Sequence, residues 1–299
     1  MVPAFDDRDG LIWKNGELVD WRDAKVHVLN HGLHYASAVF EGERAYNRVI
    51  FKLHEHTERL FASARSLSFE IPYTVEEIDA ACDQVVRENG LVDAYVRPIA
   101  WRGSEMMAVS AQRSTIHVAI AAWPWPSMYD PEEKLKGIRL DWAEWRRPDP
   151  ATIPAKTKAT GLYMICTLSK HAAEAKGFHD ALMLDWRGLV AEATGANVFF
   201  VRGGELHTPT PDCILDGITK RTVMDLAKDR QLKVIERAID GSEIVDGAFE
   251  ECFLTGTAAE VTPVASVGDV MFPERKVCRQ LMEDYAALVR KEGAEKAVA

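Results

Sequence analysis

Alternating hydrophobic and polar positions open the chain and predict β-strands. Residues 11–14 (LIWK) and 17–20 (ELVD) flank an Asn15-Gly16 pair. Asn-Gly favours the positive φ values of a type I′ turn, so this segment is predicted to form a β-hairpin. The alternation continues through residues 24–32 (AKVHVLNHG), where extended structure is also expected.

Two helices and two longer strands are predicted next. Residues 54–67 place Leu60, Phe61, Ala64 and Leu67 on one helical face. A second helix has clear ends, because Thr74 and Glu77 form a capping-box pattern and Asn89-Gly90 stops it. The sequences AYVRPIAW and TIHVAIAAW (94–101 and 115–123) are then typical of strands in a buried sheet.

Prolines mark a break near the middle of the chain. Pro124, Pro126 and Pro131 precede Gly137, and proline fixes φ and removes a backbone donor. We therefore expect an N-terminal α/β domain at residues 1–126, an interdomain loop at 127–137 and a C-terminal domain at 138–299. Further elements are expected in the C-terminal domain: strands at 138–145, 181–185, 189–193, 197–208 and 251–256, and helices at 161–176, from about Ile218, and from Pro273 to Gly293.

Composition excludes several classes of protein. The 299 residues carry a formal net charge of −10, which disfavours partners with a phosphate backbone or an anionic membrane surface. No run of about 18 apolar residues predicts a membrane span. The N-terminus has no signal-peptide pattern, and the five cysteines are scattered without a C-x-x-C pair, so a reduced cytoplasmic protein is expected.

Two segments have the character of anion sites. The sequence LDGIT (215–219) leads into a predicted helix, whose first N–H groups attract anions. The sequence TGTAA (255–259) follows a strand and offers hydroxyl and backbone N–H groups. Taken alone, each is also explained as an ordinary helix start or a strand-end turn. P-loop and dinucleotide-binding glycine motifs are absent.

Histidine pairs and two lysines are weaker candidates. His31 and His34 lie in an apparent turn without a nearby cysteine or carboxylate, so no metal site is expected there, and none is expected at His54 and His56. Lys156 and Lys158 precede a predicted helix, where two solvated surface lysines are the ordinary explanation.

Seven motifs, in order and at matching spacing, give the sequence a family resemblance. They are HYASAVFEG, H-x-x-RL at 56–60, AYVRP, KATGLY, EATGANVFF, LDGIT and GTAAEVTP. Together they resemble the branched-chain amino acid aminotransferases, which are class IV aminotransferases among the fold-type IV enzymes that use pyridoxal 5'-phosphate. The resemblance runs from about residue 10 to 270. It implies an α+β fold of two domains, a smaller N-terminal α/β domain and a larger C-terminal pseudo-barrel that binds the cofactor.

The resemblance implies roles for residues around the cofactor ring. Lys158 would hold the cofactor through a Schiff base and then carry the proton between substrate Cα and cofactor C4′. Lys156, two residues before the matching position, is treated as non-catalytic. Glu192 would face the pyridine nitrogen and keep the ring protonated. Tyr163 would donate a hydrogen bond to the phenolic oxygen.

Two further sets of residues would hold the cofactor phosphate and the substrate. By the resemblance, the phosphate would be bound by Arg59, Ile218, Thr219 and Thr257, and Leu215 and Gly217 would also contact the cofactor. The substrate α-carboxylate would be bound by Tyr95 and by the N–H groups of Thr257 and Ala258. Phe40 and a Tyr35 that reaches across a dimer interface would line the side-chain pocket. Arg97 would pair with the distal carboxylate of glutamate.

The implied activity is transamination between L-leucine, L-isoleucine or L-valine and 2-oxoglutarate, by at least a homodimer. The alternative on the same scaffold is a D-amino-acid or (R)-amine transaminase, and an aminodeoxychorismate lyase is disfavoured by the AYVRP segment. One position departs from the bacterial pattern. Met128 stands where a pocket tyrosine is usual, with Tyr129 beside it, so the sequence leaves the range of substrates open.

Overall fold

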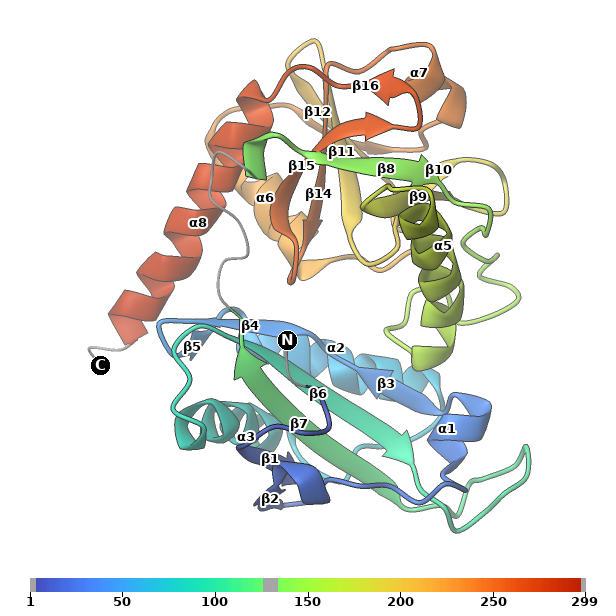
Figure 1. Cartoon of the computed structure of the whole chain (residues 1–299), viewed down its shortest axis with the longest axis vertical. Coiled ribbons are helices and arrows are strands. Elements are labelled where there is room, and N and C mark those ends of the chain that lie inside the picture. The colour runs from blue at the N-terminus through green and yellow to red at the C-terminus, as the bar shows by residue number, and fades with distance from the viewer. Residues whose placement is uncertain (1–3, 126–133, 297–299) are drawn as a thin grey trace. The chain divides into compact units, whose positions relative to one another are not determined.

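The structure is a computed structural model that describes residues 4–125 and 134–296, with side chains up to residue 291 (Figure 1). Internal contacts divide the chain into two compact units. The N-terminal unit contains Met1–Pro126, Thr157–Gly161 and Val289–Ala299, and the C-terminal unit contains Ser127–Lys156 and Leu162–Leu288. Most of the predicted interdomain loop, with Met128 and Tyr129, lies outside the described residues.

An antiparallel sheet forms the centre of the N-terminal unit. Its strands are β1 (Leu11–Lys14), β2 (Glu17–Asp20), β3 (Ala38–Phe40), β4 (Glu43–Tyr46), β5 (Val49–Ile50), β6 (Ala94–Arg102) and β7 (Ile116–Pro124). Their order is β2-β1-β7-β6-β4-β5, and β3 also pairs with β6. The helical elements are η1 (Trp21–Asp23), α1 (His31–Tyr35), α2 (Leu53–Ser66) and α3 (Val75–Glu88). Helix α3 packs against β1, β6 and β7, and α2 packs against α3 and β3.

Local sequence signals in this unit give the expected structures. Asn15 and Gly16 have φ values of 54° and 98° and join β1 to β2. Thr74 and Glu77 make both hydrogen bonds of a capping box at the start of α3. The extended structure expected at residues 24–32 is wrong, since no strand forms there and α1 begins at His31. The apolar side chains Val26, Val28 and Leu29 of this segment face solvent, so the alternation of apolar and polar residues did not indicate which residues are buried.

A second sheet curls on itself in the C-terminal unit. Its strands are β8 (Ile138–Trp142), β9 (Asp180–Leu184), β10 (Val190–Ala193), β11 (Asn197–Arg202), β12 (Glu205–Pro209), β13 (Val234–Arg237), β14 (Glu251–Gly256), β15 (Glu260–Val267) and β16 (Val270–Met271). The order is β10-β9-β8-β15-β14-β11-β12-β13, with β16 beside β15. The two ends of this path meet, because Val190 N–H donates to the Ile239 carbonyl at 2.8 Å just after β13. The pseudo-barrel prediction is thereby confirmed.

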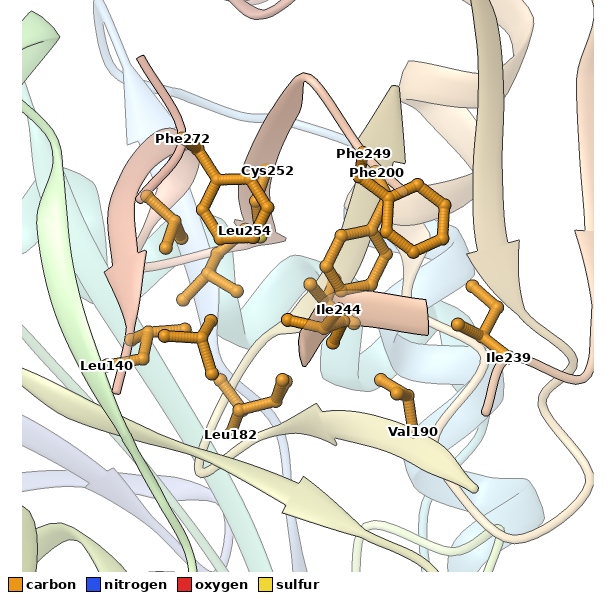
Figure 2. Packing of buried hydrophobic residues seen from close by; sticks show 14 of the residues in the cluster. Leu140, Leu182, Val190, Phe200, Ile239, Ile244, Phe249, Cys252, Leu254 and Phe272 are labelled. Atoms are coloured by element: carbon orange, nitrogen blue, oxygen red, sulfur yellow. The ribbon is translucent and has the colours of Figure 1, made fainter. Parts of the chain in front are cut away.

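Side chains from strands across the curled sheet meet in one core. Leu140, Leu182, Phe200, Leu254 and Phe272 are almost fully buried and point toward one another (Figure 2). The helices of this unit are η2 (Thr160–Tyr163), α5 (Met164–Ala175), α6 (Ile218–Asp229), α7 (Gly241–Val245) and α8 (Lys276–Lys296). Segments η2 and α8 also contain residues of the N-terminal unit. Burial of this core is worth roughly 25 cal/mol for each Å² of apolar surface removed from water.

The last helix differs from its prediction at both ends. Helix α8 starts at Lys276 rather than Pro273 and continues through Gly293 to Lys296. A single glycine in a helix costs about 1 kcal/mol, which does not by itself end a helix. Over the described residues, no helix combines the length and the apolar character that a membrane span needs.

Candidate active site

The segment that carries Lys158 is anchored inside the N-terminal unit. Phe40 N–H donates to the Lys158 carbonyl at 3.1 Å, and Lys158 N–H donates to Ser63 Oγ at 3.2 Å. Ala159 forms an antiparallel bridge with Val39, which extends the contact by one residue. Lys158 is half-buried, whereas Lys156 is exposed, so of the two lysines only Lys158 has a sheltered position.

Aromatic rings and cations gather around Lys158. Lys158 Nζ lies 5.0 Å from the centre of the Phe40 ring, and Arg97 Cζ lies 4.6 Å from the same centre. Arg97 Nη2 donates to the Tyr95 hydroxyl at 3.1 Å. Gly42 makes room for that hydroxyl, because a Cβ there would approach the oxygen to 2.0 Å. Four residues predicted for the site thus come together in one unit.

A proline in β6 shapes this group. Strands β3 and β4 pair with the two ends of β6, and the ladder is interrupted at Glu41 and Gly42. Pro98 stands opposite the interruption and has no N–H to donate, although its carbonyl accepts from Glu41 N–H at 2.8 Å. The break leaves Glu41 and Gly42 as a short irregular segment between β3 and β4.

Arg59 is held by a buried carboxylate that the sequence interpretation had given no role. Glu41 accepts from Arg59 Nε at 2.7 Å and from Nη2 at 2.8 Å, and it bonds His56 Nδ1 at 2.8 Å. Burial raises the pKa of Glu41, but the charge and hydrogen bonds of Arg59 outweigh it, and the pKa falls well below its usual range. Burial lowers the pKa of His56, so this ring is neutral at pH 7.

Glu192 is the centre of a second group, in the C-terminal unit. It is buried on β10, where Arg147 Nε lies 3.3 Å from Oε1 and Asn197 Nδ2 donates to Oε2 at 3.2 Å. Burial lowers the pKa of Arg147, but the negative charge of Glu192 more than compensates and leaves the pKa raised. Glu192 therefore stands as a buried carboxylate with a fixed orientation and a cationic partner.

The predicted anion turn precedes helix α6 in the same unit. Gly217 occupies the N-cap and supplies no side chain, so no side-chain cap covers the first turn at Ile218 and Thr219. The turn is tied down at Leu215, whose carbonyl accepts from Asn197 Nδ2 at 2.9 Å. The fully buried Lys220 holds Asp216 at 3.2 Å. The turn offers N–H groups at the positive end of a helix.

The remaining predicted residues lie at element ends. Tyr163 is the N-cap of α5, and Thr257 and Ala258 form the turn between β14 and β15. Tyr35 ends α1, stacks on His31 with ring centres 4.6 Å apart and is 45% exposed. His31 and His56, considered above as metal ligands, instead bond the Ala108 carbonyl and Glu41.

Four supporting residues were missed by the sequence interpretation. Glu41, His56 and Asn197 stand within quoted motifs but had no assigned role, and Arg147 lies outside all of them. The sequence signal for Glu41 was a glutamate that directly follows the apolar run AVF and precedes a glycine. The pairing of Arg147 with Glu192 joins positions 45 residues apart, and no local pattern reveals it.

Comparisons with known proteins decide the family. The model of the family described as amino-transferase class IV matches residues 38–267, about three quarters of the chain. The chain belongs to the class IV aminotransferases. A branched-chain-amino-acid aminotransferase of Pseudomonas aeruginosa is 42% identical over 268 residues, 88% of this chain and 87% of that protein. The resemblance inferred from seven motifs is confirmed.

Solved class IV aminotransferases share the fold. The crystal structure of the branched-chain aminotransferase from the thermophilic archaeon Thermoproteus uzoniensis with norvaline has a TM-score of 0.90 at 36% identity, with 95% of this chain and 96% of that chain covered. The branched-chain amino acid aminotransferase from Thermobaculum terrenum in its PLP-form has a TM-score of 0.85 at 32% identity, with 95% of this chain and 94% of that chain covered. The predicted two-domain α+β architecture is confirmed by these similarities.

Proposed function

We propose that the protein transfers the amino group between L-branched-chain amino acids and 2-oxoglutarate, with pyridoxal 5'-phosphate as its cofactor. The observation that carries this proposal is the group of Phe40, Tyr95 and Arg97 around Lys158. It combines an amine, an apolar ring and a cation, which suits a site that accepts both an aliphatic side chain and a carboxylate. Full-length similarity to branched-chain amino acid aminotransferases supports it.

The residues of the C-terminal unit fit the chemistry of this cofactor. A buried carboxylate suits a protonated pyridine nitrogen, and Glu192 is held ready for that contact by Arg147. An uncapped helix start suits a phosphate, and α6 provides one at Ile218 and Thr219. When bound, pyridoxal 5'-phosphate supplies the ring that accepts the electrons of the substrate Cα–H bond.

The protein's own residues supply binding, orientation and proton transfer. Lys158 would hold the cofactor and, once released, move a proton at the substrate Cα. Tyr163 would orient the cofactor through its phenolic oxygen. The phosphate would be held by Arg59, Ile218, Thr219 and Thr257, and Leu215 and Gly217 would also contact the cofactor. Glu41 fixes two nitrogens of Arg59 and so sets the direction of its guanidinium plane.

Substrate selection would depend on Arg97. Tyr95, Thr257 and Ala258 would bind the α-carboxylate, while Phe40 and Tyr35 line the side-chain pocket. Arg97 would pair with the distal carboxylate of glutamate. When leucine is bound, the Arg97 guanidinium keeps the Tyr95 hydroxyl and the Phe40 ring as partners. These contacts limit the free-energy cost of leaving the cation without a carboxylate.

We further propose that the enzyme is at least a homodimer in the cytoplasm. Apolar side chains are exposed along residues 26–35, at Val26, Val28, Leu29, Leu33 and Tyr35. A contiguous apolar segment of this kind is typical of an interface. All five cysteines are buried and unpaired, in keeping with a reducing compartment. Sedimentation equilibrium of the wild type and of Leu33→Glu tests the dimer, and a monomeric wild type would reject it.

The test of function uses the visible absorbance of the purified yellow enzyme. Single donors are added without a keto acid: L-leucine, L-glutamate, D-alanine or (R)-1-phenylethylamine, with Lys158→Ala as the blank. Bleaching by L-leucine and L-glutamate alone supports the proposal. Bleaching mainly by D-alanine or the (R)-amine overturns the substrate assignment, and a colourless wild type overturns the cofactor assignment.

A further inference from the structure

Asn197 joins two of the segments to which the proposed function assigns the cofactor. It is the first residue of β11 and is 5% exposed. Its amide nitrogen donates to Glu192 Oε2 at 3.2 Å and to the Leu215 carbonyl at 2.9 Å. A side-chain amide has two N–H donors, so these two bonds use its full donor capacity. Because both partners are acceptors, they also fix which end of the amide faces them.

The other end of the amide packs against the start of α6. A Cβ on Gly217 would lie 2.2 Å from Asn197 Oδ1, far inside any real contact. Gly217 has a φ of −64°, which every residue adopts, so its backbone conformation does not require glycine. Glycine is needed there because the asparagine side chain occupies the space that a Cβ would fill.

The backbone of Asn197 is equally constrained. In the ladder between β11 and β14 it stands opposite Thr255, two residues before Thr257. Glu192, the Leu215–Gly217 turn and the end of β14 thus all contact, or pair with, this one residue. Arg147 holds the other oxygen of Glu192, so the carboxylate has a charged partner on one side and the asparagine on the other.

We propose that Asn197 is a positioning residue that sets the distance between the Glu192 carboxylate and the anion-binding turn at Leu215–Gly217. The inference rests on the proposed function, in which Glu192 meets the ring nitrogen and the turn meets the phosphate. A rigid cofactor requires a fixed spacing between these two contacts. One side chain that bonds both provides that spacing directly. Residues that orient the ligands of a metal change its affinity by about 10- to 100-fold, and we expect an effect of that size here.

The test measures binding of pyridoxal 5'-phosphate to apoenzyme by fluorescence quenching, with urea unfolding in parallel. Asn89→Ala is the matched control, since Asn89 Nδ2 also donates to two acceptors, the carbonyls of Leu11 and Val85, within the N-terminal unit. We expect Asn197→Ala to weaken binding by about 10- to 100-fold and Asn89→Ala to leave it unchanged. Any loss of stability common to both variants is then separated from the effect on the site.

Asn197→Asp adds a pH signature that a purely structural role does not produce. An ionised aspartate places a second carboxylate beside Glu192, whereas a protonated one still donates a hydrogen bond. Its binding defect should therefore grow as the pH rises from 5 to 8, and that of Asn197→Ala should not. Wild-type affinity in Asn197→Ala, or an equal loss in Asn89→Ala, overturns the inference and leaves the proposed function intact. A wild type that does not bind the cofactor overturns both.

Discussion

The Lys158 group of the N-terminal unit and the Glu192 group of the C-terminal unit are built from different interactions. Around Lys158, the Phe40 ring faces the Arg97 guanidinium at 4.6 Å and the Lys158 amine at 5.0 Å, and such contacts require only a position over the ring face within about 6 Å of its centre. Around Glu192, Arg147 and Asn197 hold the two carboxylate oxygens at 3.3 Å and 3.2 Å, and the hydrogen bond from Asn197 depends strongly on direction.

The difference matches what each group must accept. A transaminase uses two amino donors with unlike side chains but the same cofactor in every cycle. The aromatic rings of Phe40 and Tyr95 can contact either amino donor, and Arg97 can bond the Tyr95 hydroxyl when the donor has no distal carboxylate. This group therefore suits a substrate that varies. A carboxylate fixed at both oxygens suits a ligand that does not change. The proposed assignment of roles therefore follows the kind of interaction as well as the position in the sequence.

The largest effect is expected from Lys158→Ala. Loss of the amine should lower the rate of amino transfer by at least about 10³-fold, because the proposed function assigns both cofactor attachment and proton transfer to it. Single-turnover absorbance with L-leucine measures this. The exposed Lys156 is the control, and Lys156→Ala should behave as the wild type. If Lys158→Ala kept its turnover, the catalytic role assigned to Lys158 would be wrong.

The second effect tests the rigid group. Glu192→Gln leaves Arg147 buried without its carboxylate, which typically costs about 3 kcal/mol of unfolding free energy. Turnover should fall about 10²-fold as the ring loses its anionic partner. Urea unfolding and kcat measure both quantities. Glu205→Gln is the control, because its pair with Lys233 is exposed and should contribute little to the stability. Equal stability of the two variants would contradict the account of Glu192.

The third effect tests the adaptable group. Arg97→Leu should lower kcat/KM for L-glutamate about 10²-fold more than for L-leucine, since only glutamate brings a distal carboxylate that is then left unpaired. Steady-state kinetics with each donor measure the ratio. A parallel fall for both donors would show that Arg97 serves the α-carboxylate or the fold instead.

The smallest effect on turnover is expected from a substitution of Glu43, a second buried glutamate close to Glu41, whose main effect should be on stability. Burial, and then the charge of Glu41, raise the pKa of Glu43 well above 4.5. The folded state therefore keeps a proton that the unfolded chain releases above pH 4.5, and stability falls as the pH rises through that range. Between pH 4.5 and the folded-state pKa, each pH unit lowers the free energy of unfolding by about 1 kcal/mol.

Glu43→Gln removes this titration. Urea unfolding at pH 5, 6 and 7 should show a shallower decline in stability for the variant than for the wild type. Identical slopes would mean that Glu43 is ionised in the folded protein. This result would add a third fixed carboxylate to Glu41 and Glu192, and would weaken the contrast between the two units.

Local sequence signals predicted much of the fold correctly. Features that depend on a tertiary partner could not be predicted from the sequence. The Asn15-Gly16 turn and the Thr74 capping box act within a few residues, so the sequence predicts them correctly. Residues 24–32 have the same alternation as a strand but no partner strand, and pairing is a property of the whole sheet. The stop at Gly293 failed because a glycine ends a helix only with a suitable cap.

The candidate site divides in the same way. Motifs at 40–42, 95–97 and 158 named residues that the structure brings together in one unit. Their supports were not predictable, because Glu41 meets Arg59 across 18 positions and Arg147 meets Glu192 across 45. A sequence shows which residue types are present, whereas buried pairing depends on the strand order that folding imposes.

The assignment of Thr157–Gly161 to the N-terminal unit has a consequence for synthesis on the ribosome. The first 126 residues emerge without the strand-like segment that bridges Val39 and bonds Phe40 and Ser63. The end of α8, which also belongs to the N-terminal unit, is synthesised later still, and it brings the ion pair of Arg290 with Asp93 at 3.4 Å. The unit that begins first therefore reaches its full set of contacts last, and a fragment cut at residue 126 should be a poor substitute for the domain.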